Sequence, residues 1–456
     1  MLQKKKLYRD LMAIVAPIAF QYLMSSLVTA SDAFMLGFLD QTPLSAASLA
    51  GQIAFVFSLF YGAFVGGLSV LAAQYWGKND RRTVEAVYAM TMRYSLATGL
   101  LFTAAAALFP QLIMRIFTSD PALIRLGAQY LRTVALSYVL TGFSQASFGI
   151  MKICGQAGLS SLIGSLSVVL NIVLNYILIF GKCGLPEMGI TGAALATVIA
   201  RVFESVFVLV LMRRGKCLPL RIGMMLSGKR TELRRDYWKY TVPLLLNQLG
   251  WGGGVTMYSV IMGHLGNDAT AANSIAGIVR GMIASFCWGI ATGVGILLGG
   301  MLGRGELDDA KKAGGSFVRF SLWVGAGSGL IILALTPLVL RVTTLTGQAQ
   351  VYLKYMMLMA SYYIIGNSLN STVIGGMFPA GGDTRFGMIC DIVTLWCVVV
   401  PMGMIAAFVL KLPVLAVAFI LTLDEFVKIP AVYRHYMKYE WIKNLTKEQE
   451  LHTEEG

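Results

Sequence analysis

Residues 17–50 read PIAFQYLMSSLVTASDAFMLGFLDQTPLSAASLA, and residues 243–276 read PLLLNQLGWGGGVTMYSVIMGHLGNDATAANSIA. The two stretches align without a gap at a spacing of 226 residues, and each begins with proline. Glycines and small residues go on matching at this spacing up to Gly155, which falls opposite Gly381. An internal repeat of this size in an apolar chain is typical of a transporter built from two halves around a central pathway.

The composition predicts an all-α integral membrane protein. Hydrophobic residues make up 56% of the chain and charged residues only 13%, so the chain needs lipid as its solvent. Stretches of about 20 apolar residues are long enough to cross a bilayer as helices. Twelve such stretches are present, six in each half, near 11–36, 46–75, 88–109, 124–148, 158–181, 190–212, 240–263, 272–300, 316–340, 351–375, 386–410 and 413–434. We therefore expect twelve transmembrane helices in two pseudo-symmetric six-helix bundles.

The domain organisation follows from the repeat and from the charged segments. We predict an N-terminal bundle over 1–212, a basic cytoplasmic linker over 213–239, a C-terminal bundle over 240–437 and a cytoplasmic tail over 438–456. The polar tail is expected to fray. Six helices return the chain to its starting side, so both halves insert with the same orientation, as in parallel-repeat transporters.

Lys and Arg residues orient the chain in the membrane. Most of those between the apolar stretches fall on the side of the two termini and the basic linker. The other side holds Arg115, Arg125, Lys182, Arg341 and Lys411. The positive-inside rule then places both termini in the cytoplasm of a plasma (inner) membrane. The net charge of +14 is read as this orientation signal, and a nucleic-acid partner is not expected.

Residues for enzymatic chemistry are not gathered in the sequence. The six cysteines and three histidines are scattered without metal-ligand spacing, and no phosphate-binding glycine loop is present. We expect neither an enzyme nor a resident cofactor.

Several segments carry a family resemblance. They are SDAFMLG at 31–37, LSAASLA at 44–50, VLAAQYWG at 70–77, GQAG at 155–158, NIVLNYILIFG at 171–181, GITGAALAT at 189–197 and GGDTR at 381–385. Together they resemble the multidrug and toxic compound extrusion (MATE) family. The resemblance implies two six-helix bundles that export organic, often cationic, compounds in exchange for Na⁺ or H⁺.

Asp32 is the first candidate for ion coupling. It precedes Gly37 by five residues, which places it roughly 7 Å inside the outer end of its helix. An acid at such a depth usually marks an ion or substrate pathway, although it could instead reach the outer interface. The resemblance implies that the matching Asp binds the coupling ion.

Asn171 and Asn175 lie four residues apart and share one helix face. With Asp32 and the hydroxyl of Thr197 they offer hard oxygen ligands, which suit Na⁺ as they suit other hard cations. The alternative is ordinary hydrogen bonding between helices. Some proton-coupled members of the family carry Asp in place of Asn175, which favours Na⁺ here, but Asp32 alone could still carry H⁺.

The second half of the chain contains fewer candidates for ion coupling. One branch of the family carries Glu eight residues after the proline of helix seven, and this chain has Trp251 there, so a Glu-based second site is not expected. Asp391 lies about 9 Å inside its helix and is either a second acidic site or an acid satisfied by neighbouring amides. We therefore place the ion site in the first half alone.

The remaining intramembrane charges are assigned to structure first. Arg201 and Glu204 are predicted to form a neutralising pair at i, i+3, and Asp424, Glu425 and Lys428 a similar neutralising group, in which Asp424 and Lys428 stand at i, i+4. Arg280 has no evident partner in the sequence and is a candidate residue of the substrate cavity.

Polar residues near the two repeat prolines could contact substrate. They are Gln21, Tyr22, Asn247 and Gln248, and packing between helices is the equal alternative. The expected partners are a small organic molecule, a monovalent cation or proton and the lipid bilayer, with the chain working as a monomer. The alternative function is a flippase for a lipid-linked saccharide or a related amphipathic substrate, for which Arg280 would supply the cationic cavity.

Overall fold

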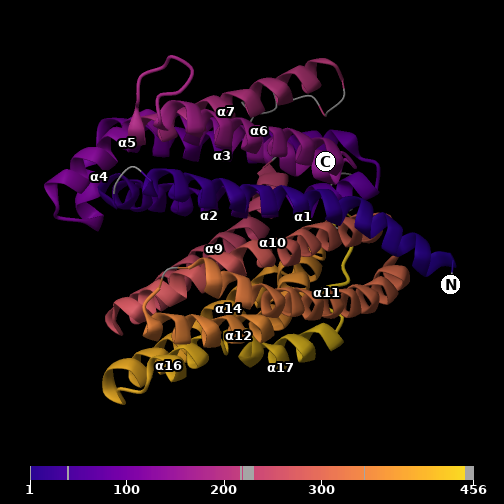
Figure 1. Ribbon diagram of the computed structural model, residues 1–456. Helices are drawn as coiled ribbons and strands as arrows, with labels where there is room; N and C mark the ends of the chain where they lie inside the picture. Colours follow the sequence, from indigo (N-terminus) through magenta and orange to yellow (C-terminus); the bar gives the residue numbers. More distant parts are fainter. Residues whose placement is uncertain (1, 39–40, 216–217, 219–230, 344, 447–456) are drawn as a thin grey trace. The chain divides into compact units, whose positions relative to one another are not determined.

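The structure is a computed structural model that describes residues 2–38, 41–215, 218, 231–343 and 345–446. Within these residues every regular element is a helix (Figure 1). The first half contains α1 (Leu2–Gly37), α2 (Gln41–Gly77), α3 (Arg81–Leu108), α4 (Pro110–Phe117), α5 (Pro121–Ile153), α6 (Ala157–Ile179) and α7 (Gly189–Arg213).

The second half contains more and shorter elements, three of them π-helical and labelled η. They are α9 (Thr231–His264), α10 (Asn267–Gly303), α11 (Leu307–Val342), α12 (Gly347–Asn370), η1 (Ser371–Met377), α13 (Phe378–Ala380), α14 (Thr384–Ile392), η2 (Val393–Val399), α15 (Val400–Met404), η3 (Ile405–Val409), α16 (Val414–Leu421) and α17 (Asp424–Met437). Each of the twelve predicted apolar stretches is helical, so the all-α prediction is confirmed.

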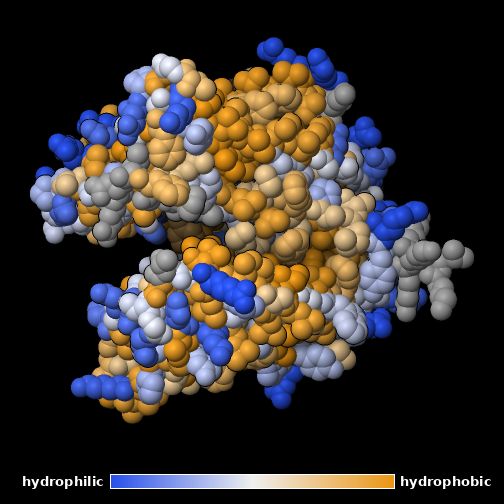
Figure 2. All heavy atoms as spheres, in the orientation of Figure 1, coloured by the Kyte–Doolittle hydropathy of each residue, from blue (hydrophilic) through white to orange (hydrophobic). Residues whose placement is uncertain are grey.

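The described helices have the length and surface of membrane spans. Eight of them are long and apolar enough to cross a bilayer, and α3 with α4, bent by 88°, makes a ninth if counted as one span. The other predicted spans are helical as well. Large apolar side chains are highly exposed, as at Trp323 (79%) and Ile116 (76%), and Figure 2 shows hydrophobic residues over much of the visible helical surface. Such a surface requires contact with lipid.

The repeat seen in the sequence reappears in the bounds of the helices. Helices α2 and α10 each contain 37 residues, and both their first and their last residues are 226 positions apart. Helices α3 and α11 begin at the same spacing, at Arg81 and Leu307, and so do α5 and α12, at Pro121 and Gly347. The repeat therefore encodes where helices begin.

The second half departs from the first by its irregular helices. Its counterpart of α5 contains η1, its counterpart of α6 contains η2 and η3, and its counterpart of α7 is divided into α16 and α17. Pro379 and Pro401 each follow the end of a π-helical stretch by two residues. Proline lacks the N–H of an α-helical bond and crowds the carbonyl four residues earlier, which widens the preceding turn.

The described chain forms two compact units. The N-terminal unit comprises residues 24–72 and 80–238, and the C-terminal unit comprises residues 1–23, 73–79 and 239–456. Helices α1 and α2 therefore each contribute to both units. Most of the predicted linker, at 216–217 and 219–230, lies outside the described residues.

The N-terminal unit is held by packing of α5 between its neighbours. Helix α5 contacts α3 and α7, and α6 contacts α7. Aromatic rings fill the core beside α3 and α5: Phe57 and Tyr138 meet edge to face with ring centroids 5.5 Å apart. This packing fixes α6 and α7, which carry three of the predicted site residues.

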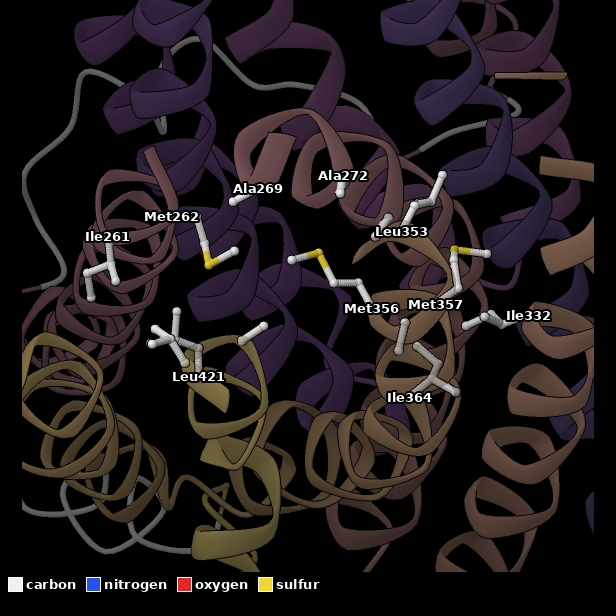
Figure 3. Packing of buried hydrophobic residues seen from close by; sticks show 14 of the residues in the cluster. Ile261, Met262, Ala269, Ala272, Ile332, Leu353, Met356, Met357, Ile364 and Leu421 are labelled. Atoms are coloured by element: carbon white, nitrogen blue, oxygen red, sulfur yellow. The ribbon is translucent and has the colours of Figure 1, made fainter. Parts of the chain in front are cut away.

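One apolar cluster of the C-terminal unit lies among α9, α10, α12 and α16. Figure 3 shows the side chains of Met262, Met356 and Leu421 turned toward one another within this cluster. Helix α10 also packs closely against the end of α2, where a Cβ on Gly303 would lie 1.9 Å from the carbonyl oxygen of Gln74. Glycine is required by that approach.

The described part of the predicted tail is packed rather than frayed. Trp441 is fully buried, and the side chain of Gln74 donates to the carbonyls of Ala380 and Lys443 at 2.6 and 3.1 Å. Its amide oxygen accepts from the backbone N–H of Leu445 at 2.7 Å. The expectation of a frayed tail is wrong up to residue 446, because these bonds and the buried indole fix the segment. Residues 447–456 lie outside the described residues.

Candidate functional site

The N-terminal unit brings together the four predicted ion-coupling residues. Asp32 on α1 accepts a hydrogen bond from the side-chain amide of Asn175 on α6. The same amide donates to Oδ1 of Asn171 at 3.1 Å, and the amide of Asn171 donates to Oγ1 of Thr197 at 3.4 Å. The hydroxyl of Thr197 is anchored by donating to the carbonyl of Ala193 at 3.1 Å. The result is a continuous polar chain from α1 through α6 to α7.

Burial makes this chain chemically significant. Asn171 is 3% exposed and Asn175 is fully buried. Oδ1 of Asn175 has no hydrogen-bond partner among the described residues. A buried amide oxygen without a donor is costly unless it binds something further. The site therefore offers a carboxylate and an unused oxygen ligand next to each other.

A buried ion pair lies beside Asp32. Arg201 and Glu204 on α7 are joined through Nη1 at 2.7 Å, which confirms the predicted pair. The carboxyl of Asp32 also interacts electrostatically with Arg201 and with the phenol of Tyr130. Arg201 thus serves two carboxylates, and the neighbourhood of Asp32 carries one more acid than base.

The C-terminal unit contains a second charged cluster, which includes Asp391. Oδ2 of Asp391 accepts from the side-chain amide of Asn247 at 2.9 Å, and its Oδ1 lies 3.0 Å from Nζ of Lys428. Asp391 is thus bonded to an amide, as one sequence alternative expected, and also to a cation that the sequence did not indicate. Lys428 is 4% exposed and lies 3.1 Å from Oε2 of Glu425 as well.

Glu425 is the most heavily bonded acid of this cluster. Besides Lys428, its carboxylate accepts from Asn370 at 2.7 Å, from Asn367 at 3.1 Å and from the hydroxyl of Tyr363 at 3.4 Å. These three donors lie on one face of α12. All of them suit an ionised carboxylate.

Within the predicted group of Asp424, Glu425 and Lys428, the ion pair forms at i, i+3 with Glu425 and not at i, i+4 with Asp424. Lys428 forms its ion pairs with Glu425 on its own helix and with Asp391 on α14. The amides of α12 hold Glu425 on the face of α17 that Lys428 also occupies. The ammonium of Lys428 therefore pairs with Glu425, three residues earlier, and not with Asp424, four residues earlier. Asp424 is 2% exposed, and its Oδ1 has no hydrogen-bond partner among the described residues.

Arg280 has an aromatic partner. Its guanidinium lies 5.0 Å above the ring of Tyr363, a cation–π contact. Arg280 also lines a cavity of about 50 Å³ together with Tyr258, Asn273 and Thr422. A cavity of this volume holds a few waters and is far smaller than the roughly 300–1,000 Å³ of drug-sized ligand pockets.

The other predicted cavity residues fall in the C-terminal unit. Gln21 is buried, Tyr22 meets Trp288 edge to face with centroids 6.5 Å apart, and Gln248 is half-buried. Asn247 is engaged by Asp391. None of these four side chains lines the cavity beside Arg280.

Three residues of the second cluster were not predicted from the sequence. Asn367, Asn370 and Tyr363 reach Glu425 from α12. The signal was the spacing of the two amides at i, i+3 in an apolar helix, the same kind of signal that identified Asn171 and Asn175.

Comparison with known proteins agrees with this fold and repeat. The sequence profile of the MatE family matches residues 17–177 and again residues 243–405. The two matches begin 226 residues apart, at the repeat prolines. The family profile thus describes one half of the chain and recognises both halves.

Individual proteins extend the likeness over nearly the whole chain. The probable multidrug resistance protein YoeA of Bacillus subtilis (strain 168) is 25% identical over 433 residues, which cover 91% of this chain and 90% of that protein. The probable multidrug resistance protein NorM of Thermotoga maritima is 25% identical over 404 residues, covering 87% and 85%. A solved structure of a MOP superfamily transporter from Pyrococcus furiosus has the same fold, with a TM-score of 0.86 at 18% identity over 96% of both chains. Because the profile spans well over half of the residues, the chain belongs to the MatE family of membrane transporters.

Proposed function

We propose that the chain is a secondary active antiporter that exports organic, often cationic, compounds in exchange for Na⁺ or H⁺. The observation that carries the proposal is the buried chain from Asp32 through Asn175 and Asn171 to Thr197. The names of the relatives, which are multidrug resistance proteins, support the class of substrate.

The amide of Asn175 gives the site two states. With Asp32 ionised, the Nδ2 group of Asn175 donates to the carboxylate and its Oδ1 is unused. Once a proton or Na⁺ binds at Asp32, the charge is neutralised and an amide oxygen becomes the better neighbour. A rotation of the amide by half a turn supplies that oxygen, because an amide carries a donor and an acceptor of similar shape.

This change of state is the physical basis for coupling. The polar chain joins α1 to α6 and α7, so the protonation or ion occupancy of Asp32 alters how these helices are bonded. Coupling requires that the ion and the substrate prefer different conformations by a few kcal/mol. Alternating access of the two bundles then exchanges one for the other.

Efflux of a cationic dye from vesicles tests the proposal. The full chain is reconstituted, and a Na⁺ or a H⁺ gradient is imposed separately; the gradient that drives efflux identifies the ion. Asp32→Asn is expected to abolish gradient-driven efflux, and Glu187→Gln, at an exposed acid of the same unit, to leave it unchanged. Full gradient-driven efflux by Asp32→Asn would refute the assignment of Asp32. Dye transport absent under both gradients would favour the flippase.

The orientation is part of the proposal: a plasma-membrane monomer with both termini in the cytoplasm. The distribution of Lys and Arg supports it. Cys183, an exposed residue between α6 and α7, then faces the outside. A membrane-impermeant maleimide added to intact cells is expected to label the chain, and Cys183→Ser to remove the label. Labelling that appears only after the membrane is opened would contradict the orientation.

A further inference from the structure

The charged cluster of the C-terminal unit is not balanced. Three buried or half-buried acids interact there, namely Asp391, Asp424 and Glu425, with the two bases Lys428 and Arg280. One negative charge is left over when all five are ionised. An isolated charge in a low-dielectric interior is costly, and such clusters usually take up a proton or another cation.

The excess charge can be assigned to one residue by its bonding. Asp391 and Glu425 each share Lys428, and both accept hydrogen bonds from side-chain amides. Asp424 is 2% exposed, and no described donor reaches its Oδ1. Asp424 is therefore the acid that gains most from a proton.

A small cavity, which Asp424 does not itself line, lies among groups that interact with its carboxylate. Thr422, two residues earlier in the chain, lines it, and so do Tyr258 and Arg280, both of which interact electrostatically with Asp424. The hydroxyl of Tyr258 has no hydrogen-bond partner among the described residues. A cavity of about 50 Å³ with such groups has room for a few waters, which can relay a proton toward the carboxylate.

The repeat places this cavity where an ion site is expected. At the spacing of 226 residues, Tyr258 is the counterpart of Asp32, and Leu423, next to Asp424, is the counterpart of Thr197. In the N-terminal unit the polar chain runs from an acid on the first helix, through two amides, to a hydroxyl on the last helix. In the C-terminal unit the hydroxyl is on α9 and the acid on α17. Relative to the N-terminal unit, the acid and the hydroxyl thus lie on each other's helices.

We propose that Asp424 is a second proton-binding site, which is loaded from the cavity lined by Tyr258, Thr422 and Arg280. A proton is favoured over Na⁺ because it needs a single carboxylate oxygen, whereas a metal ion needs several oxygen ligands at once. On loading, a hydronium in the cavity transfers its proton to a carboxylate oxygen of Asp424, an O–H bond forms and water remains. Unloading reverses the step, and nothing is oxidised or reduced.

The state of Asp424 is set by groups on every helix around it. Glu425 and Lys428 lie on its own helix, Arg280 on α10, Tyr258 on α9, Tyr362 and Tyr363 on α12 and Asp391 on α14. Glu425 carries the same charge as an ionised Asp424, whereas Lys428 and Arg280 carry the opposite charge. Motion of Arg280 away from Asp424 would therefore favour binding of the proton, and motion toward Asp424 would favour its release. The role in transport rests on the proposed antiport function, but binding of the proton does not.

Infrared difference spectroscopy between high and low pH tests the binding directly. The full chain in lipid nanodiscs is compared with Asp424→Asn, with Asp424→Glu and with Asp309→Asn, an exposed acid of the same unit. The carbonyl-stretch band of a protonated carboxylic acid is expected to be lost in Asp424→Asn, to move in Asp424→Glu and to persist in Asp309→Asn. If every wild-type band persists in the folded Asp424→Asn protein, or none moves in Asp424→Glu, the proposal is overturned.

A transport measurement tests the role. The number of protons moved per dye molecule, taken from the gradients at which dye flux reverses, is expected to fall by one in Asp424→Asn. An unchanged number would overturn the transport role of Asp424. These outcomes differ from failure of the Asp32 assignment, which is read from efflux by Asp32→Asn.

Discussion

Glu425 is the residue at which a conservative change should be most damaging. In the wild type both carboxylate oxygens of Glu425 accept from hydrogen-bond donors. Glu425→Gln replaces one of these oxygens by an NH₂ group, which is itself a donor. If the NH₂ replaces Oε2, it meets Nζ of Lys428 at 3.1 Å and the amide of Asn370 at 2.7 Å. If it replaces Oε1, it meets the amide of Asn367 at 3.1 Å and the hydroxyl of Tyr363 at 3.4 Å.

The second orientation sets the expected cost. The hydroxyl of Tyr363 can turn to accept, so one buried amide donor is left without a partner, which costs about 1–3 kcal/mol. The charge that balanced Lys428 is lost as well, and breaking a buried ion pair costs about 3–5 kcal/mol when its partner has no other acid. Because Lys428 keeps Asp391, we expect a loss of about 3 kcal/mol in the free energy of unfolding.

Unfolding by SDS in mixed micelles, followed by tryptophan fluorescence, measures this loss. Glu440→Gln makes the same chemical change at an exposed position of the same unit and should stay within about 0.5 kcal/mol of the wild type. A Glu425→Gln protein within about 1 kcal/mol of the wild type would show that the bonds to Glu425 are not formed as described.

Three further predictions concern the scaffold. Gly303→Ala places a Cβ 1.9 Å from the backbone oxygen of Gln74, so we expect a loss of at least about 1–3 kcal/mol and less monodisperse protein on size-exclusion chromatography; Gly327→Ala, on α11 with open space around its Cβ position, is the matched control and should keep the wild-type profile. Asp80→Ala removes the cap of α3, whose carboxylate accepts from the backbone N–H of Thr83 at 3.0 Å, and should cost about 1 kcal/mol in the same unfolding assay; no change would exclude a capping role. In the connection between α10 and α11, hydrogen bonds from Arg304 hold the pKa of Glu306 below its ordinary value. The stabilisation from this pair is present above the unfolded pKa of Glu306 and lost as pH falls through the lower folded value. Because the two side chains are 48% and 42% exposed, Glu306→Gln should change unfolding by less than about 0.5 kcal/mol at neutral pH and by nothing in acid; a larger change in acid would contradict the sign.

The regular part of the fold could be predicted because its signals are local. Apolar stretches of membrane length, ended by glycines such as Gly77 and Gly303, give the helices and their repeat directly. The contact of Asn175 with Asp32 could also be anticipated, since two amides on one helix face need a partner. In both cases residue spacing within one helix, or within one repeat, contains the information.

The C-terminal cluster could not be predicted in the same way. One of its ion pairs joins α14 to α17, and its amides come from α9 and α12, so the surroundings of Lys428 depend on how four helices pack. The i, i+4 spacing of Asp424 and Lys428 suggested a pair, but an acid from another helix and the amides around Glu425 outweighed it. A helix pattern shows which residues share a face and does not show what that face meets.

The two repeats share the residues that shape the backbone but not the buried charged residues. Glycine and proline positions set where helices begin, end and approach, and these recur because a shifted helix end would disrupt the packing of a whole half. A buried charge requires only that some group within reach compensates it, and that group can come from any adjoining helix. In the N-terminal unit Asp32 and Glu204 share Arg201, which leaves one excess acid. In the C-terminal unit Asp391, Asp424 and Glu425 share Lys428 and Arg280, which again leaves one. The side chains differ between the two units, but each unit has one buried acid more than it has bases. This is expected if each half binds and releases one positive charge.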